Sequence, residues 1–212
     1  MDLFKMLQEQ MSGDLIQNLS QQVGANEQQT AQAAQGIFGA LIGGLANNAS
    51  TPAGLGALSS ALDKDHDGSI MDDLLGLING TAPVNPRAAN GNGIIKHVLG
   101  GNQDQVAQQI SQSSGLNMNQ IMKLMPIIAP IVLGLLGKLR SNNQQNSGGG
   151  MMDIAQILMG SAQSAQSGGL GNILGTVLGG VLNNQQAQQQ QQQQQQGSGG
   201  LLGDLFGKIF GR

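Results

Sequence analysis

One acidic stretch contains the residues best suited to chemistry. Five of the twelve acidic residues of the chain fall between positions 63 and 73, in the sequence DKDHDGSIMDD. Asp63, Asp65 and Asp67 alternate along the chain and are followed by Gly68, as in the first half of an EF-hand loop. Carboxylates in this order converge on one cation, and the glycine permits the sharp turn. The spacing therefore predicts a calcium site.

The second half of this candidate site is less regular. Ser69 would offer its backbone carbonyl at the seventh loop position, and Asp72 or Asp73 would close the site. Leu74 stands at the twelfth position, where an EF-hand has a bidentate glutamate, so we expect weak affinity. Magnesium and an ordinary acidic turn are the alternatives, because aspartate and glycine also favour turns and helix starts. The predicted metal ligands are Asp63, Asp65, Asp67, Ser69, Asp72 and Asp73.

Few other side chains could support catalysis. The chain has no cysteine, which removes disulfides, thiolate metal sites and cysteine nucleophiles. His97 has no carboxylate or second histidine at helical spacing, and His66 stands at a loop position that normally faces solvent. No serine stands in a GxSxG context. We therefore expect no catalytic residues and a non-enzymatic protein.

Composition argues against nucleic acid as a partner. The 212 residues have a net charge of −3, only 10% of them are charged, and 2% are aromatic. A nucleic-acid surface needs a basic patch or aromatic side chains on which bases stack. The chain supplies neither in quantity.

The sequence predicts neither a secretory signal nor a membrane span. The start, MDLFK, has no basic region followed by an apolar core. The most apolar segment, LMPIIAPIVLGLLG at 124–137, is shorter than the roughly 20 residues that cross a bilayer. We expect a buried core helix, with an interfacial or re-entrant segment as the alternative. The default location is the cytoplasm, and an envelope location stays open because a weak calcium site would be mostly empty in the cytoplasm.

Hydrophobic periodicity predicts an all-α fold. Apolar residues recur at spacings of three and four, and no stretch alternates for long enough to form a strand. Gly24 is expected to end one helix, and Asn26 to cap the next with Gln29 three positions later. Helices are expected at 3–22, 26–46, 53–62, 72–78, 93–99, 102–113, 117–139, 151–159 and 170–182.

Glycine, proline and amide-rich stretches divide the chain into blocks. The expected organisation is a first helical block with the acidic loop, a linker, a second helical block, a second linker, glycine-rich short helices, a glutamine-rich flexible segment and an apolar terminal helix. Their bounds are 1–80, 81–92, 93–140, 141–150, 151–182, 183–200 and 201–212.

Two segments resemble each other at a separation of 91 positions. Residues 17–29, QNLSQQVGANEQQ, align without gaps to residues 108–120, QQISQSSGLNMNQ. The identities include the turn glycine and asparagine: Gly24/Gly115 and Asn26/Asn117. Shared composition is the alternative explanation. The match favours a duplicated helix–turn–helix unit whose two copies bury their apolar faces together.

Glycines recur every four residues near the C-terminus, at Gly171, Gly175, Gly179, Gly203, Gly207 and Gly211. Such spacing lets helices approach closely. The expected helices are too short and too polar to cross a bilayer, so we expect self-association or contact with a membrane surface. A structural or interaction role is the leading expectation, and a membrane-surface or pore-like protein is the alternative.

Several stretches resemble one bacterial family. They are GLGALSSALDKDHDGSIMDDL at 54–74, NGNGIIKHVLGG at 90–101, SQSSGLN at 111–117 and LMPIIAPIVLGLLGK at 124–138. Together they resemble the family known as domain of unknown function 937, over residues 1–140 and at most to 182. The resemblance implies a small all-helical bacterial protein without an established activity, in which the DxDxDGS loop recurs. It supplies no catalytic residues, and the glutamine-rich tail lies outside it.

Overall fold

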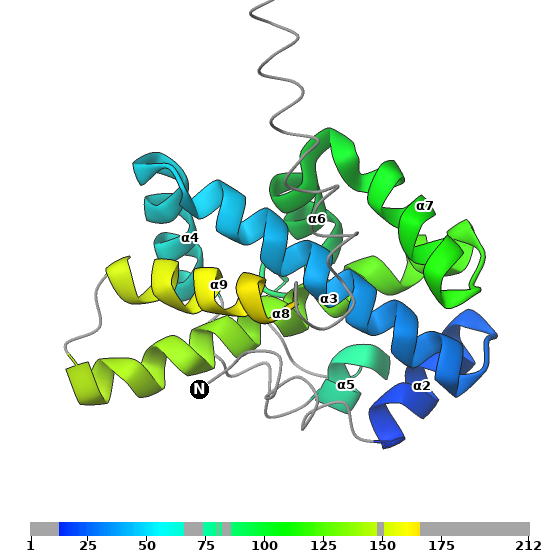
Figure 1. Ribbon diagram of the computed structural model, residues 1–212. Coiled ribbons are helices and arrows are strands. Elements are labelled where there is room, and N and C mark those ends of the chain that lie inside the picture. The colour runs from blue at the N-terminus through cyan, green and yellow to red at the C-terminus, as the bar shows by residue number, and fades with distance from the viewer. Residues whose placement is uncertain (1–12, 66–73, 80, 82–85, 148–150, 166–212) are drawn as a thin grey trace, which may run out of the picture. The chain divides into compact units, whose positions relative to one another are not determined.

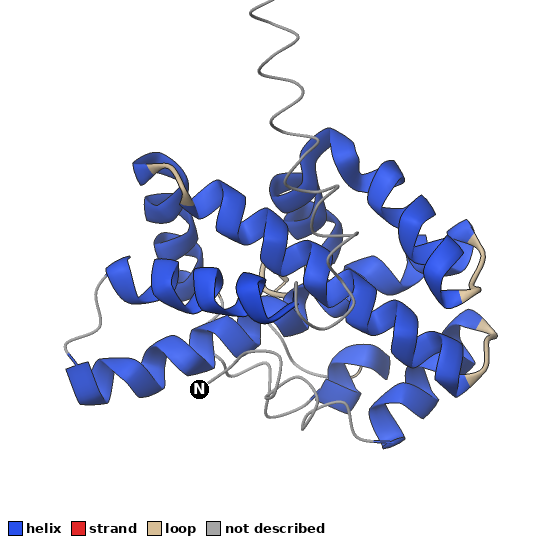
Figure 2. Ribbon diagram, in the orientation of Figure 1, coloured by secondary structure: helices blue, strands red, loops and turns tan. Residues whose placement is uncertain are grey.

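A computed structural model describes residues 13–65, 74–79, 81, 86–147 and 151–165 (Figure 1). All regular structure in these residues is helical, as Figure 2 shows, so the all-α expectation is confirmed for them. Expectations that fall on 1–12, 66–73 and 166–212 lie outside the described residues. The helices are α2 (Gly13–Val23), α3 (Glu27–Ala49), α4 (Pro52–Lys64), α5 (Leu74–Asn79), α6 (Gly91–Leu99), the 3-10 helix η2 (Gly100–Asn102), α7 (Gln103–Ser114), α8 (Met118–Ser147) and α9 (Met151–Ala165).

Local sequence signals set the turn between α2 and α3. Gly24 has φ of +64°, the left-handed conformation that glycine adopts without a Cβ penalty and that often ends a helix. Asn26 caps α3, and its side chain accepts a hydrogen bond from the backbone N–H of Gln29 at 2.8 Å. Both features agree with the sequence prediction.

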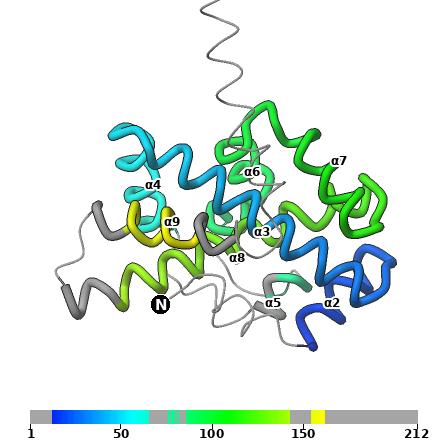
Figure 3. The backbone as a smooth tube through the Cα atoms, in the orientation of Figure 1, coloured from blue at the N-terminus to red at the C-terminus, as the bar shows by residue number. Residues whose placement is uncertain are grey.

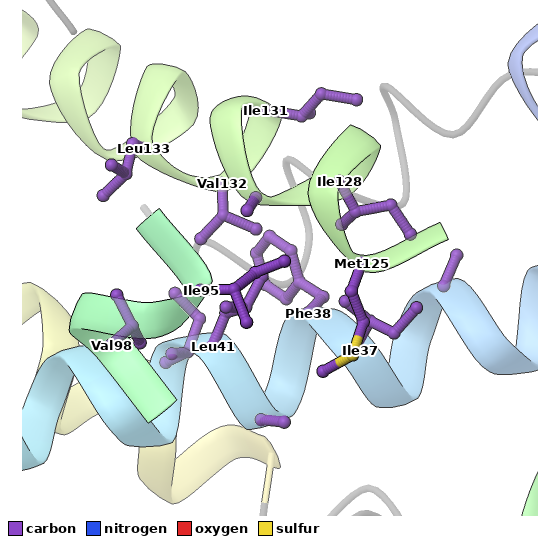
Figure 4. Packing of buried hydrophobic residues seen from close by; sticks show 14 of the residues in the cluster. Ile37, Phe38, Leu41, Ile95, Val98, Met125, Ile128, Ile131, Val132 and Leu133 are labelled. Atoms are coloured by element: carbon purple, nitrogen blue, oxygen red, sulfur yellow. The ribbon is translucent and has the colours of Figure 1, made fainter. Parts of the chain in front are cut away.

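Helix α3 is the centre of the bundle. It contacts α2, α4, α6, α7, α8 and α9, and Figure 3 shows it passing between the other helices. Its middle, residues 36–45, contains no polar side chain and is buried on all sides, whereas its first turns carry exposed polar residues. Figure 4 shows Ile37, Phe38 and Leu41 packed in the core it shares with α6 and α8. The largest fully buried side chains are Phe38, Leu19, Ile37, Leu41, Ile42, Leu62, Ile95, Ile110, Ile121, Leu124 and Met125.

Helix α8 is longer than the sequence suggested. We expected it to end at 139 and a linker to follow at 141–150, but it continues to Ser147. Residues 140–147 contain neither glycine nor proline, and a glycine appears only at position 148, so no local signal ends the helix earlier. Pro126 and Pro130 lie inside it. Each proline removes one hydrogen bond to the carbonyl four residues back, at Met122 and Pro126 respectively.

Two other boundaries differ from the expectation. The expected loop 47–52 shortens to Ser50 and Thr51, because α3 runs to Ala49 and the Thr51 hydroxyl caps α4 by accepting from the N–H of Gly54 at 3.1 Å. Pro52 then occupies the first helical position, which suits its fixed φ. Helix α6 likewise begins at Gly91 inside the expected linker, because Asn90 caps it.

Candidate functional site

The acidic loop starts inside a helix. Asp63 belongs to the last turn of α4, and Asp65 is the C-cap of that helix. The expectation that the loop begins at Asp63 is therefore corrected by two residues. Four further predicted ligands, Asp67, Ser69, Asp72 and Asp73, lie outside the described residues. Within the part of the chain that the structure describes, no group of three or more His, Cys, Asp or Glu side chains could hold a metal ion.

Asp63 already has a cationic partner. The guanidinium of Arg140 on α8 approaches both of its carboxylate oxygens, with Nη1 2.8 Å from Oδ1 and Nη2 3.2 Å from Oδ2. This bidentate geometry is the strongest form of a carboxylate–arginine pair. Nη1 also donates to the backbone carbonyl of Ser59 at 3.1 Å. Arg140 therefore ties the C-terminal turn of α4 to α8.

The two partners differ in burial. The side chain of Arg140 is 11% exposed, whereas that of Asp63 is 54% exposed. The Nε atom of Arg140 is buried and makes no hydrogen bond. A buried guanidinium needs a counter-charge far more than an exposed carboxylate does, because desolvation penalises only the former. The ion pair therefore stabilises the charge of Arg140 more than it stabilises the charge of Asp63.

The buried hydroxyls are engaged locally. In the described residues the buried serines and threonine each donate to a carbonyl of their own helix: Ser20 to Gln17 at 2.8 Å, Thr30 to Asn26 at 2.8 Å, Ser114 to Ile110 at 2.6 Å and Ser161 to Ile157 at 2.7 Å. Such back-bonding satisfies a buried hydroxyl inside a helix. These hydroxyls are thus engaged with the backbone of their own helices.

His97 is exposed and lies at the C-terminal end of α6. Its contribution to packing is made by its backbone: Nδ2 of Asn48 on α3 donates to the carbonyls of His97 at 3.1 Å and Val98 at 3.4 Å. These carbonyls are near the end of α6, where no following N–H of the same helix is available to donate to them. Asn48 is therefore a C-terminal cap supplied by another helix, and no local sequence signal could have revealed it.

Among the described residues, one helical stretch is long and apolar enough to cross a membrane. It is Met118–Asn142 of α8, 25 residues whose most apolar window has a mean hydropathy of 1.8. The 14-residue apolar segment at 124–137 lies within this longer helix, because α8 extends beyond it on both sides. Its most apolar window is 72% buried inside the bundle. That burial agrees with the expected core helix, and length and composition by themselves fit either kind of helix.

The described residues thus define an all-helical bundle with an apolar core and an ion pair between the buried Arg140 and the exposed Asp63, where the acidic stretch begins. The family described as "Bacterial protein of unknown function (DUF937)" matches residues 5–139. This match covers more than half of the chain, and the chain belongs to that family. The resemblance inferred from the sequence is thereby confirmed. No curated protein and no solved structure matches the chain significantly.

Proposed function

We propose that this bacterial protein is non-enzymatic and has a structural or interaction role. The observation that carries the proposal is the use of its buried polar side chains: the hydroxyls bond to their own helices, and the guanidinium of Arg140 holds α4 to α8. A catalytic site needs polar groups that converge on a substrate. Here the hydroxyls bond within their own helices, and Arg140 joins two helices.

The duplicated helix–turn–helix unit belongs to this proposal. A duplicated unit that cannot bury its apolar face alone gains stability by packing on its copy. The first unit comprises α2 and α3, and the second comprises α7 and α8. Such a pair forms a rigid helical scaffold.

We further propose that the acidic loop binds calcium weakly. The alternation of Asp63, Asp65 and Asp67 before a glycine supports this, because this spacing is that of the first three ligands of an EF-hand loop. Arg140 limits the contribution of Asp63, since its guanidinium engages both carboxylate oxygens and would repel a nearby cation. Asp65 and Asp67 are then the main ligands, with the Ser69 carbonyl and Asp72 or Asp73 completing the site.

Isothermal titration of calcium into the chelator-treated full chain tests this proposal. The variant Asp65→Asn/Asp67→Asn removes two ligands and leaves the Asp63–Arg140 pair intact, which Asp63→Asn would not. Asp104→Asn, an exposed carboxylate on α7, is the control for loss of one surface charge outside the loop. Saturable 1:1 heat that disappears only in the loop variant supports a calcium site. Absence of heat up to millimolar calcium makes the loop an acidic turn.

Contact with a membrane surface is the second candidate function, favoured by the apolar length of α8. Co-sedimentation with zwitterionic and anionic vesicles separates the two functions. For a structural or interaction protein we expect the full chain to stay in the supernatant with both kinds of vesicle. Pelleting with either kind would favour the membrane function, as the burial of α8 would then have to be released.

Self-association through the glycine-spaced C-terminal residues remains part of the interaction proposal. Light scattering after size-exclusion chromatography measures it directly on the full chain. Gly175→Ile/Gly207→Ile should convert an oligomer to a monomer, whereas Gly101→Ala, an exposed glycine with open space around it, should not.

An enzyme would be revealed by saturable turnover of ester or phosphate substrates that His97→Ala abolishes, and we expect none.

A further inference from the structure

The two helix–turn–helix units have the same turn geometry. Each turn contains a left-handed glycine, with φ of +64° at Gly24 and +75° at Gly115. Each second helix begins at an asparagine whose Oδ1 accepts from the N–H of a glutamine three residues later. The distances are 2.8 Å for Asn26 with Gln29 and 2.9 Å for Asn117 with Gln120.

The same two glutamines connect the units to each other. Nε2 of Gln120 donates to the carbonyls of Val23 and Gly24 at 3.0 and 3.2 Å. Reciprocally, Nε2 of Gln29 donates to the carbonyl of Gly115 at 3.4 Å, a longer bond. Each glutamine therefore reaches the C-terminal turn of the other unit's first helix, where carbonyls lack intrahelical donors.

Each glutamine amide is oriented by its own helix start. Oε1 of Gln29 accepts from Nδ2 of Asn26 at 2.9 Å, and Oε1 of Gln120 accepts from the backbone N–H of Asn117 at 3.0 Å. With the amide oxygen held by the local cap, the NH₂ group faces the other unit. One side chain thus closes its own cap and bonds across the interface, and glutamine is suited to both tasks because it has an acceptor and two donors.

Burial follows the same correspondence. At equivalent positions, 91 residues apart, both members of these pairs are buried: Leu15/Val106, Ile16/Ala107, Leu19/Ile110, Ile37/Ile128 and Leu41/Val132. At four other buried positions a small residue in one unit corresponds to a large one in the other: Ala33/Leu124, Ala34/Met125, Phe38/Ala129 and Ala40/Ile131. Complementary volumes of this kind let two like faces fill a common core without voids. They also make each unit a better partner for the other than for an identical copy.

We infer that the two units form an intramolecular dimer of one self-pairing module, and that Gln29 and Gln120 are the positioning residues that set its register. The partner that each surface fits is a helix–turn–helix unit with the same Gly-x-Asn-x-x-Gln turn, supplied by the other half of this chain. This inference rests on the duplication proposed above.

The substitutions Gln29→Glu and Gln120→Glu distinguish pairing from local capping, because the two roles predict opposite changes in stability. Glutamate at this position keeps the capping acceptor and favours the helix dipole, so a purely local role predicts unchanged or higher stability. Pairing predicts the opposite, because a carboxylate cannot donate to the partner carbonyl and places negative charge beside it. We expect each variant to lower Tm by about 2–4 °C. Gln28→Glu and Asn119→Asp, exposed neighbours at equivalent positions, are the controls for charge and should not lower it.

Hydrogen exchange provides a readout that a local role would not change. In Gln120→Glu, amide exchange should accelerate at Ala25 of the first unit, and in Gln29→Glu it should accelerate at Leu116 of the second. The pairing inference is overturned if both variants melt like their controls, or if exchange changes only within the mutated unit.

The duplication is tested separately by replacing residues 24–29 with GLNMNQ, the sequence of 115–120. A cooperative transition in this chimera supports the duplication even where the pairing inference fails, and its loss counts against both.

Discussion

Gly91 at the start of α6 lies directly against the backbone carbonyl of Pro126 in α8, so closely that a Cβ at Gly91 would overlap the carbonyl oxygen. This carbonyl is the one that Pro130, four residues later, cannot satisfy, because proline has no N–H. The absence of a side chain at Gly91 lets α6 pack over the proline-interrupted part of α8. The NGNG sequence, expected to be a linker, is thus a point of close helix packing.

Gly91→Ala should destabilise the protein strongly, since neither the backbone of α8 nor that of α6 can move aside cheaply. We expect the free energy of unfolding to fall by about 1–3 kcal/mol, the usual effect of overpacking, or by more. Gly56→Ala in α4 is the matched control, because open space surrounds Gly56. It should raise stability by about 0.5–1 kcal/mol through helix propensity. Chemical denaturation of both variants measures the difference, and equal effects would disprove the close packing.

The Asp63–Arg140 pair should respond asymmetrically to removal of either partner. Asp63→Ala leaves a buried guanidinium without its counter-charge, and we expect a loss of about 1–3 kcal/mol. Arg140→Met keeps the apolar stem and leaves an exposed carboxylate that water can solvate, so its effect should be smaller. The double variant should be more stable than Asp63→Ala alone. A double-mutant cycle measured by urea unfolding checks this order, and the reverse order would contradict the burial argument.

The turn glycines should differ in their tolerance of alanine. Gly24 has open space around it, so Gly24→Ala should reduce stability only by the left-handed backbone strain of about 1–2 kcal/mol. At Gly115 a Cβ would also lie 2.8 Å from Nε2 of Gln29, so Gly115→Ala should lower Tm further. In a Gln29→Ala background, Gly115→Ala should lower Tm by no more than Gly24→Ala does. If Gly115→Ala still lowers Tm more in that background, Gln29 is not the cause of the difference.

Asn48 should matter through its contact with the end of α6. Asn48→Ala removes the donor to the carbonyls of His97 and Val98, and we expect a loss of about 1 kcal/mol. The isosteric change Asn48→Asp should destabilise more, because it places a negative charge at the C-terminal end of a helix. Thermal melts followed by circular dichroism test the order. Asn47→Ala is the comparison on the same helix, since the hydrogen bonds to the end of α6 come from the side chain of Asn48.

Much of the fold could be predicted because its causes are local. The apolar stripe of α2, the stop at Gly24 and the cap at Asn26 depend on residues within one or two turns of each other, and all three are present as expected. The 91-residue correspondence aligns Gln29 with Gln120, and in the structure each of these glutamines donates to a carbonyl of the other unit. The acidic spacing from Asp63 to Asp73 predicts a cation site on the same kind of short-range argument, and calcium binding there stays a prediction.

Tertiary structure decided what depends on residues far apart in the chain. Nothing near Asp63 indicates that Arg140 pairs with it, and nothing in NGNG indicates that Gly91 packs on Pro126. Helix α8 passes through both of its prolines, as expected for 117–139, because packing against α3 and α6 stabilises it more than two missing hydrogen bonds weaken it. Sequence patterns thus determined the helices and their turns, which are fixed by short-range sterics and hydrogen bonds. Packing alone determined which faces, charges and carbonyls meet, since that depends on burying the apolar surface of the whole bundle.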